Sequence, residues 1–286
     1  MSAASFSFAR VPFDETSIEP FGCLLTAHQP ALPVGAIDVA LLRRMVERHA
    51  LVVLRDFATF DDASALSDYA ARWGEPMSWP FGTVLELREQ SDAADHIFDH
   101  SYVPLHWDGM YRPWIPKYQI FHCVQAPGEA HGGETTFCHT GRVLAHATPA
   151  QRARWEDVTV TYEIAKVSHY GGRVRSPLVT AHPEDRARRV MRYNEPPEPG
   201  VRFVNPHRVS FDGISADAQP TLIAELRESL RDRRHYYAHR WRTRDLVIAD
   251  NYQLLHGREA YASRCARHLQ RVHVLGAPPH ANGALL

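Results

Sequence analysis

Apolar residues recur at helical spacing near the start of the chain. Between Val39 and His49 they return every three or four positions, directly after Asp38, whose carboxylate can accept hydrogen bonds from the first N–H groups of a helix. We therefore predict a helix there, capped by Asp38. The apolar run from Leu51 to Leu54 is too short for a helix and predicts a buried strand. A second helix is expected after Asp61, with apolar positions at Leu66, Tyr69 and Trp73.

Beyond Trp79 the pattern changes to short β-rich runs separated by clusters of Gly, Pro and Asp. Apolar residues alternate from Val158 to Ile164, which is typical of a half-buried strand. Further strands are expected at Thr83 to Leu87, Tyr118 to Val124, Thr135 to Phe137 and Leu246 to Asp250. Many short strands favour a sandwich or barrel, so the pattern alone predicts an all-β or α+β sandwich.

Three later segments complete the expected organisation. The stretch Asn194 to Gly200 contains three prolines, which remove ladder donors, so we expect a surface loop that can act as a lid. A helix from about Asp217 to Arg231 is predicted to pack outside the sheet through a leucine stripe, and the tail from Gly276 is expected to be mobile. We expect a single domain over residues 1–286 with a core at about 35–275, after a short N-terminal segment.

Composition excludes several classes of protein. A formal net charge of -1 gives no bulk attraction to nucleic acid or anionic lipid, so neither is an expected partner. The chain has no apolar run of the roughly 20 residues that span a membrane, and its first residues have no apolar run long enough for a signal peptide, so a cytoplasmic location is expected. The cysteines form no C-x-x-C pair and are expected to be buried free thiols: Cys23, Cys123, Cys138 and Cys265.

The strongest chemical signal is a set of metal-ligand side chains. His106 and Asp108 stand two apart, so in a strand both side chains leave the same face. His256 follows the predicted strand that ends at Asp250 and can supply a third ligand. With 18 histidines in the chain, one histidine alone is weak evidence. Two imidazoles and one carboxylate nevertheless form the facial triad of non-haem Fe(II) oxygenases, which leaves the other side of the metal open.

Two arginines add a second signal. If the segment after Arg267 is a strand, Arg267, Arg271 and His273 share one face. An exposed basic edge strand would explain this pattern. A buried arginine, however, is costly without an anion, and its planar guanidinium suits a carboxylate. The pattern therefore favours a carboxylate ligand close to the metal residues.

These motifs together resemble the taurine dioxygenase family of Fe(II)/2-oxoglutarate oxygenases over most of the chain. The resemblance rests on the H-x-D pair, on Gly132 to Thr135, on His256 and on an arginine eleven residues later. It implies a distorted jelly roll, the cupin-like double-stranded β-helix, with flanking helices. It also implies Fe(II) on His106, Asp108 and His256, with 2-oxoglutarate and O2 as cosubstrates. Thr135 and Arg267 would hold the distal carboxylate of 2-oxoglutarate, and Arg271 an anionic group of the substrate. Glu134 departs from the usual Asp.

A narrower resemblance is to the oxygenases of isonitrile pathways, such as those to paerucumarin and rhabduscin. It rests on six segments: 79–82, 95–98, 102–111, 121–124, 237–242 and 246–251. Members of that group install a Cα–Cβ double bond in an amino-acid isonitrile, with or without loss of its carboxylate. The resemblance implies tyrosine isonitrile as substrate. Phe81, Tyr102 and Tyr111 are compatible with an aromatic ligand, although core packing is the commoner role of such residues.

Other functions share the same ligands. The iron centre could hydroxylate a free amino acid or a small sulfonate instead. A zinc hydrolase could use the same three residues, but it would make no use of Thr135 and Arg267. A non-catalytic metal-binding barrel is a further alternative. All these readings imply a small-molecule ligand, and all leave the oligomeric state open.

Overall fold

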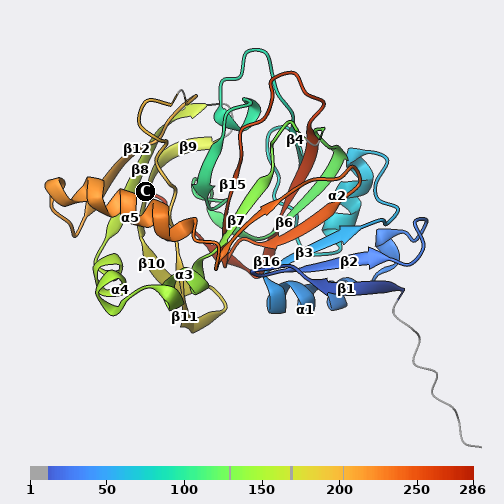
Figure 1. Cartoon of the computed structure of the whole chain (residues 1–286), viewed down its shortest axis with the longest axis horizontal. Helices are drawn as coiled ribbons and strands as arrows, with labels where there is room; N and C mark the ends of the chain where they lie inside the picture. The colour runs from blue at the N-terminus through green and yellow to red at the C-terminus, as the bar shows by residue number, and fades with distance from the viewer. Residues whose placement is uncertain (1–11, 129, 168–169, 202) are drawn as a thin grey trace, which may run out of the picture.

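The computed structural model describes residues 12–128, 130–167, 170–201 and 203–286, which are mainly β with a few helices (Figure 1). The first eleven residues, to which the expectation about a signal peptide applies, lie outside this range. Within it, no helix combines the length and apolar character needed to cross a membrane.

The largest sheet has seven strands in the order β1-β2-β3-β14-β6-β16-β4. Its strands are mostly antiparallel, and β2 and β3 form a parallel pair. In chain order they are β1 (Phe13–Ser17), β2 (Cys23–Ala27), β3 (Leu51–Arg55), β4 (Val84–Leu87), β6 (Trp114–Gln125), β14 (Leu246–Asp250) and β16 (His268–Ala281).

Three smaller sheets accompany it. A four-stranded sheet has the order β13-β7-β15-β5, a three-stranded sheet the order β12-β8-β9, and β10 pairs with β11. The first contains β5 (Val103–His106), β7 (Thr135–His139), β13 (Tyr236–His239) and β15 (Leu254–Arg258). The others contain β8 (Thr159–Val167), β9 (Tyr170–Pro177), β10 (Val179–His182), β11 (Asp185–Met191) and β12 (Arg208–Asp212).

The helices lie on the outside of these sheets (Figure 1). They are α1 (Val39–His49), α2 (Ala63–Ala71), α3 (Thr140–His146), α4 (Pro149–Glu156) and α5 (Gln219–Leu230), with short 3-10 helices η1 (Val34–Ala36), η2 (His96–Phe98) and η3 (Ala216–Ala218).

Side-chain alternation gives the seven-stranded sheet two different faces. On β6, Tyr118 and Ile120 pack in the cluster that includes residues of α1 and α2, whereas Phe121 and Cys123 belong to another cluster. That second cluster also contains Phe137 of β7 and Leu254 of β15, so it joins the inner faces of the seven-stranded and four-stranded sheets. Successive side chains of a strand point to opposite faces, so odd-numbered positions of β6 face the four-stranded sheet.

The four-stranded sheet is likewise buried on both faces. Leu105 and Leu255 pack outward into a third cluster, with residues of β8, α3 and α5. Their neighbours His106 and His256 therefore point the other way, toward the seven-stranded sheet. The leucine stripe of α5 belongs to the same outer cluster, as the sequence predicted: Leu222, Leu226 and Leu230.

Several sequence predictions are confirmed. Helix α1 has the predicted bounds, and Asp38 caps it by accepting a hydrogen bond from the Ala40 N–H at 2.9 Å. The strands at Leu51 and Val158 and the helix after Asp61 also form, although α2 ends before Trp73. The core begins earlier than residue 35, because β1 and β2 belong to the main sheet.

The prediction of a mobile tail from Gly276 is wrong. Strand β16 continues to Ala281, with His280 opposite Ile115 of β6. The Asn282 side chain then donates to three backbone carbonyls, those of Gly109, Met110 and Arg112. Small residues and prolines lowered the sequence signal, but β6 is long enough to supply the tail with a pairing partner.

The segment Asn194–Gly200 lacks regular secondary structure, as predicted, but its first half is anchored rather than exposed. The buried Glu195 carboxylate accepts from Arg227 Nε at 2.9 Å and Arg231 Nη1 at 2.6 Å, both on or beside α5. The Glu195 N–H also donates to the Leu105 carbonyl at 2.9 Å. This one residue therefore connects α5 to β5.

Replacing Glu195 by alanine should lower the free energy of unfolding by about 2–4 kcal/mol, because charge-assisted hydrogen bonds in a buried position are lost. Urea unfolding followed by tryptophan fluorescence measures the change. The control is Asp212→Ala, which removes an exposed pair with Arg175 and should cost less than about 1 kcal/mol. Equal effects of the two substitutions would contradict the anchoring role of Glu195.

Candidate metal centre

Two histidines meet because two strands pair in register. His106 ends β5, and it stands directly opposite His256 of β15 in the antiparallel ladder. Their ring centroids are 4.2 Å apart. The His106 Nδ1 atom lies 2.9 Å from the Pro104 carbonyl, a contact in which Nδ1 donates and Nε2 keeps its lone pair. Burial lowers the pKa of both imidazoles, which favours the neutral form that binds metals.

Asp108 lies beside the two histidines, and hydrogen bonds hold its backbone in place. Its N–H donates to Asn251 Oδ1 at 2.9 Å, and Asn251 Nδ2 donates to the Asp108 carbonyl at 3.0 Å. The Asp108 carboxylate then lies 3.8 Å from His106 Nε2 and 3.5 Å from His256 Nε2. One ligand atom from each residue falls within 4.8 Å of the others. The structure thus brings the three predicted ligands together, and their donor set fits Fe(II).

The seven-stranded sheet contributes the partners of the carboxylate. Asp108 Oδ2 accepts from Gln119 Nε2 at 2.5 Å, Arg271 Nη1 at 2.9 Å and His273 Nε2 at 2.7 Å. Burial by itself would raise the pKa of Asp108, but the Arg271 guanidinium, together with His273 and His256, holds it well below its usual range. Asp108 is therefore a carboxylate, with oxygens oriented by the opposite sheet.

This contact changes the expectation for Arg271. The sequence predicted that Arg271 meets an anionic group of the substrate, whereas here it binds the Asp108 carboxylate and stacks over the Phe121 ring at 5.8 Å. The alternative of an exposed basic edge strand is wrong, because β16 lies between β6 and β4 and Arg271 is buried. Arg271 also lines two cavities that meet at the metal residues.

The first cavity contains the predicted cosubstrate residues. It is lined by His106, His256, Thr135 and Arg267, among others. Thr135 Oγ1 accepts from Trp241 Nε1 at 3.0 Å, and Arg267 Nε donates to the Gly133 carbonyl at 3.0 Å. A Cβ atom on Gly133 would lie 2.9 Å from Arg267 Cδ, so glycine leaves room for this arginine. Burial lowers the pKa of Arg267, which means that an anion here would stabilise its charged form.

Sequence reasoning missed Arg258 in the same cavity. Its guanidinium donates to the carbonyls of Ile97 and Ser101, and to others nearby, so it connects η2 and the residues after it to β15. Burial lowers its pKa to about 9. A signal was available, because Arg258 stands two positions after His256 and so shares its face of the strand.

The second cavity is aromatic. Phe81 and Tyr111 line it, as the sequence predicted, and Phe81 stacks on Trp79 with ring centroids 5.9 Å apart. Tyr102 does not line this cavity. Its hydroxyl instead accepts from the Glu198 N–H at 2.5 Å, in the loop after Asn194. Three lining residues were not assigned to the site from the sequence: His96, Asn194 and His207. Asn194 and His207 are far along the chain from the other lining residues.

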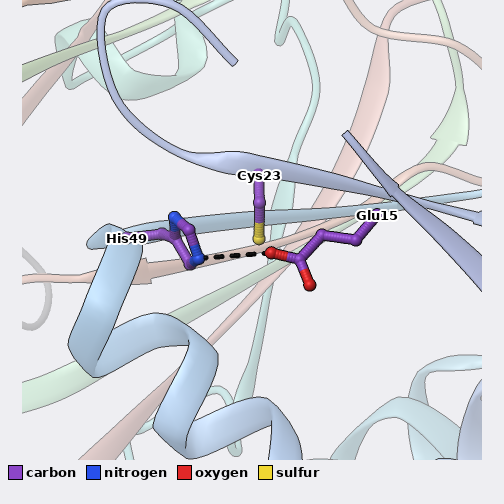
Figure 2. A group of neighbouring side chains, drawn as sticks. All are labelled: Glu15, Cys23 and His49. Atoms are coloured by element: carbon purple, nitrogen blue, oxygen red, sulfur yellow. Dashed lines mark ion pairs between the residues drawn. The ribbon is translucent and has the colours of Figure 1, made fainter. Parts of the chain in front are cut away.

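Among the described residues, a second group of potential metal ligands lies in another part of the chain from the candidate metal centre. Figure 2 shows Glu15 of β1, Cys23 of β2 and His49 of α1 around one point. His49 Nε2 and Glu15 Oε1 form an ion pair at 3.4 Å. Burial raises the pKa of the Cys23 thiol to about 12, which disfavours the thiolate form that binds metals. Cys123 and Cys138 are also buried free thiols, as expected, whereas Cys265 is partly exposed.

Known proteins resemble this chain in sequence and in fold. The chain is 45% identical over 271 residues to the tyrosine isonitrile desaturase of Pseudomonas aeruginosa, covering 94% of this chain and 92% of that protein. It is 38% identical to the 3-((Z)-2-isocyanoethenyl)-1H-indole synthase of Fischerella ambigua, covering 92% and 96%. The crystal structure of PvcB from Pseudomonas aeruginosa matches with a TM-score of 0.84 and 40% identity, covering 100% and 99%. A second PvcB structure, with a TM-score of 0.83, is described as an Fe, alpha-ketoglutarate dependent oxygenase from an isonitrile synthetic pathway.

A family model also covers most of the chain. The model of taurine catabolism dioxygenase TauD and TfdA matches residues 27–273, a range that includes the three metal-ligand candidates and both arginines. This chain therefore belongs to the TauD/TfdA dioxygenase family.

Proposed function

We propose that this protein is an Fe(II)/2-oxoglutarate-dependent oxygenase that desaturates an amino-acid isonitrile, with tyrosine isonitrile as its substrate. The observation that carries the proposal is the pair of cavities meeting at His106 and Arg271. One cavity offers a buried cation and a hydroxyl for a dicarboxylate, and the other offers aromatic walls. The names of the two curated relatives support an isonitrile substrate with an aromatic ring.

His106, Asp108 and His256 would hold the iron. Bound together, iron, 2-oxoglutarate and O2 supply a two-electron oxidation of the substrate, with succinate, CO2 and water as the accompanying products. The protein itself holds the metal ligands in a fixed arrangement. Gln119 and His273 hold the Asp108 carboxylate in one orientation, and the ring contact of His106 with His256 keeps the donor nitrogens together.

Arg267 and Thr135 would bind the distal carboxylate of 2-oxoglutarate. The guanidinium is buried and fixed through Nε, so its terminal nitrogens are left to contact a ligand in the cavity. Trp241 donates to Thr135 Oγ1, which orients the Thr135 hydroxyl to donate in turn. A carboxylate between these groups would compensate the desolvation of Arg267.

Arg271 would bind the substrate carboxylate while it keeps its contact with Asp108. It lines the aromatic cavity as well as the cosubstrate cavity, so an acid held there places its carbon chain beside the metal ligands. Positional control of this kind decides which C–H bond reacts. If the substrate carboxylate is kept, loss of one hydrogen from the carbon next to the ring and one from the carbon that bears the isonitrile gives the double bond. If the carboxylate is released as CO2, loss of one hydrogen from the carbon next to the ring and cleavage of the C–C bond to the carboxylate give it.

We also propose that the facing seven-stranded and four-stranded sheets form the distorted jelly roll of this family, in a single domain. The buried cluster that joins their inner faces supports this arrangement. The metal residues come from the smaller sheet and the Asp108 partners from the larger one.

The direct test is a mass-spectrometric assay with Fe(II), ascorbate, 2-oxoglutarate and tyrosine isonitrile. We expect an O2-dependent product two hydrogens lighter than the substrate, with or without loss of CO2, together with succinate. His106→Ala should abolish both products, because one of three ligands is lost, whereas the exposed His28→Ala should leave them unchanged. A product heavier by one oxygen would indicate a hydroxylase, and succinate without a substrate-derived product would exclude this substrate.

Arg267→Ala should raise the KM for 2-oxoglutarate by about tenfold or more, because a charge-assisted hydrogen bond to a carboxylate contributes about 1.5–3 kcal/mol. The KM for the isonitrile should change little. Steady-state succinate formation at varied 2-oxoglutarate measures the effect. The control is Arg240→Ala, an arginine 77% exposed beside Glu134. Matching KM values for the two variants would contradict the assignment of Arg267.

Arg271→Ala should raise the KM for the isonitrile more than that for 2-oxoglutarate, and should also weaken Fe(II) binding, because Asp108 loses a donor. Fe(II) titration followed by restored turnover measures the second effect. Arg271→Lys keeps the charge and should retain more metal affinity than alanine does. Equal changes in the two KM values would overturn the division between Arg267 and Arg271.

A further inference from the structure

The aromatic cavity has a group of three polar side chains in its wall, drawn from three separate segments. Tyr111 precedes β6, Asn194 follows β11, and His207 precedes β12. The Tyr111 hydroxyl lies 2.8 Å from His207 Nδ1, and Asn194 Nδ2 lies 3.2 Å from His207 Nε2. The Tyr111 and His207 rings also stack, with centroids 5.7 Å apart. The three residues therefore form one hydrogen-bonded unit, which we call the polar triad.

The polar triad carries no charge at neutral pH. Burial lowers the pKa of His207 to about 3, helped by the nearby His96 and His106, so its imidazole is neutral. Burial also raises the pKa of the Tyr111 hydroxyl, which stays protonated. An amide, a phenol and a neutral imidazole can donate and accept hydrogen bonds, but they offer no countercharge to a carboxylate or an ammonium group. The ligand group that suits them is a hydroxyl.

The same cavity is also lined by two of the candidate metal ligands and a cation. His106, Asp108 and Arg271 line it, together with the Trp79 ring, whose centroid is 5.8 Å from that of His273. His96 also lines this cavity, and its ring centroid is 6.4 Å from that of His207. A ligand that fills the cavity would thus meet a cation, aromatic walls and neutral polar groups.

We propose that Tyr111, Asn194 and His207 form a subsite for the phenolic hydroxyl of the substrate, so that the enzyme selects a 4-hydroxyphenyl ring over phenyl and indole rings. This inference rests on the proposed function, in which the carboxylate of the same ligand binds Arg271. A buried site built to hydrogen-bond a hydroxyl rejects an analogue that lacks it, because its own polar groups then lose a partner.

The test compares tyrosine isonitrile with phenylalanine isonitrile in the wild-type enzyme and in Tyr111→Phe and His207→Phe. We expect the wild type to favour the tyrosine compound in kcat/KM by about tenfold or more, the effect of one hydrogen bond in a buried site. Both variants should reduce the preference to about threefold or less, mainly by raising the KM for the tyrosine compound. The control is Tyr102→Phe, which removes a hydroxyl outside the cavity and should keep the wild-type preference.

A binding experiment separates this subsite from the proposed reaction. Calorimetry with Mn(II) and 2-oxoglutarate present would compare 3-(4-hydroxyphenyl)propanoate with 3-phenylpropanoate, neither of which carries an isonitrile. Tighter binding of the hydroxylated acid by the wild type, but not by Tyr111→Phe, supports the subsite even if isonitrile turnover fails. Normal isonitrile turnover without any preference in either experiment overturns the subsite and leaves the proposed function intact. Equal losses for both ligands in the variants would also overturn it, since they indicate a structural role alone.

Discussion

The hydrogen bonds to the Asp108 carboxylate are the interaction on which the rest of the site depends. Asp108 follows a strand of the four-stranded sheet, yet Gln119, Arg271 and His273 reach its Oδ2 from the seven-stranded sheet. A carboxylate and a guanidinium buried separately would each carry a large desolvation cost, and together they compensate each other. The pair therefore joins the two sheets across the site and orients the carboxylate of a candidate metal ligand.

The spacing of two arginines along one strand direction explains why the site has two cavities. Arg267 and Arg271 are four residues apart, which is about 13 Å in an extended chain, and alternation gives them the same face. Arg267 lines the cavity that contains Thr135, whereas Arg271 lines that cavity and the aromatic one. Two carboxylate-bearing ligands would thus each meet an arginine beside the candidate metal ligands. This geometry suits an enzyme that must bind a 2-oxo acid and an acidic substrate together.

Local patterns predicted much of the fold, and they failed where a distant partner decided the outcome. Helix α1 follows from its own apolar spacing and from the Asp38 cap, both within one short segment. The tail after Gly276 has no such local signal, and it becomes ordered because β6 pairs with it and because Asn282 binds the loop after Asp108. Tyr102 shows the same limit, since its place beside Glu198 depends on a loop nearly a hundred residues away.

The sequence by itself determined the kind of chemistry: His106 and Asp108 two apart, a later His256, and an arginine eleven residues beyond. These spacings specify which side chains share a face, because strand alternation is a local property of the backbone. Only the tertiary structure decided which faces meet. Strand register placed His106 opposite His256, and packing of one sheet on the other directed Arg271 to Asp108. Such contacts join residues far apart in the chain, so they depend on the folded arrangement of whole sheets rather than on any local pattern.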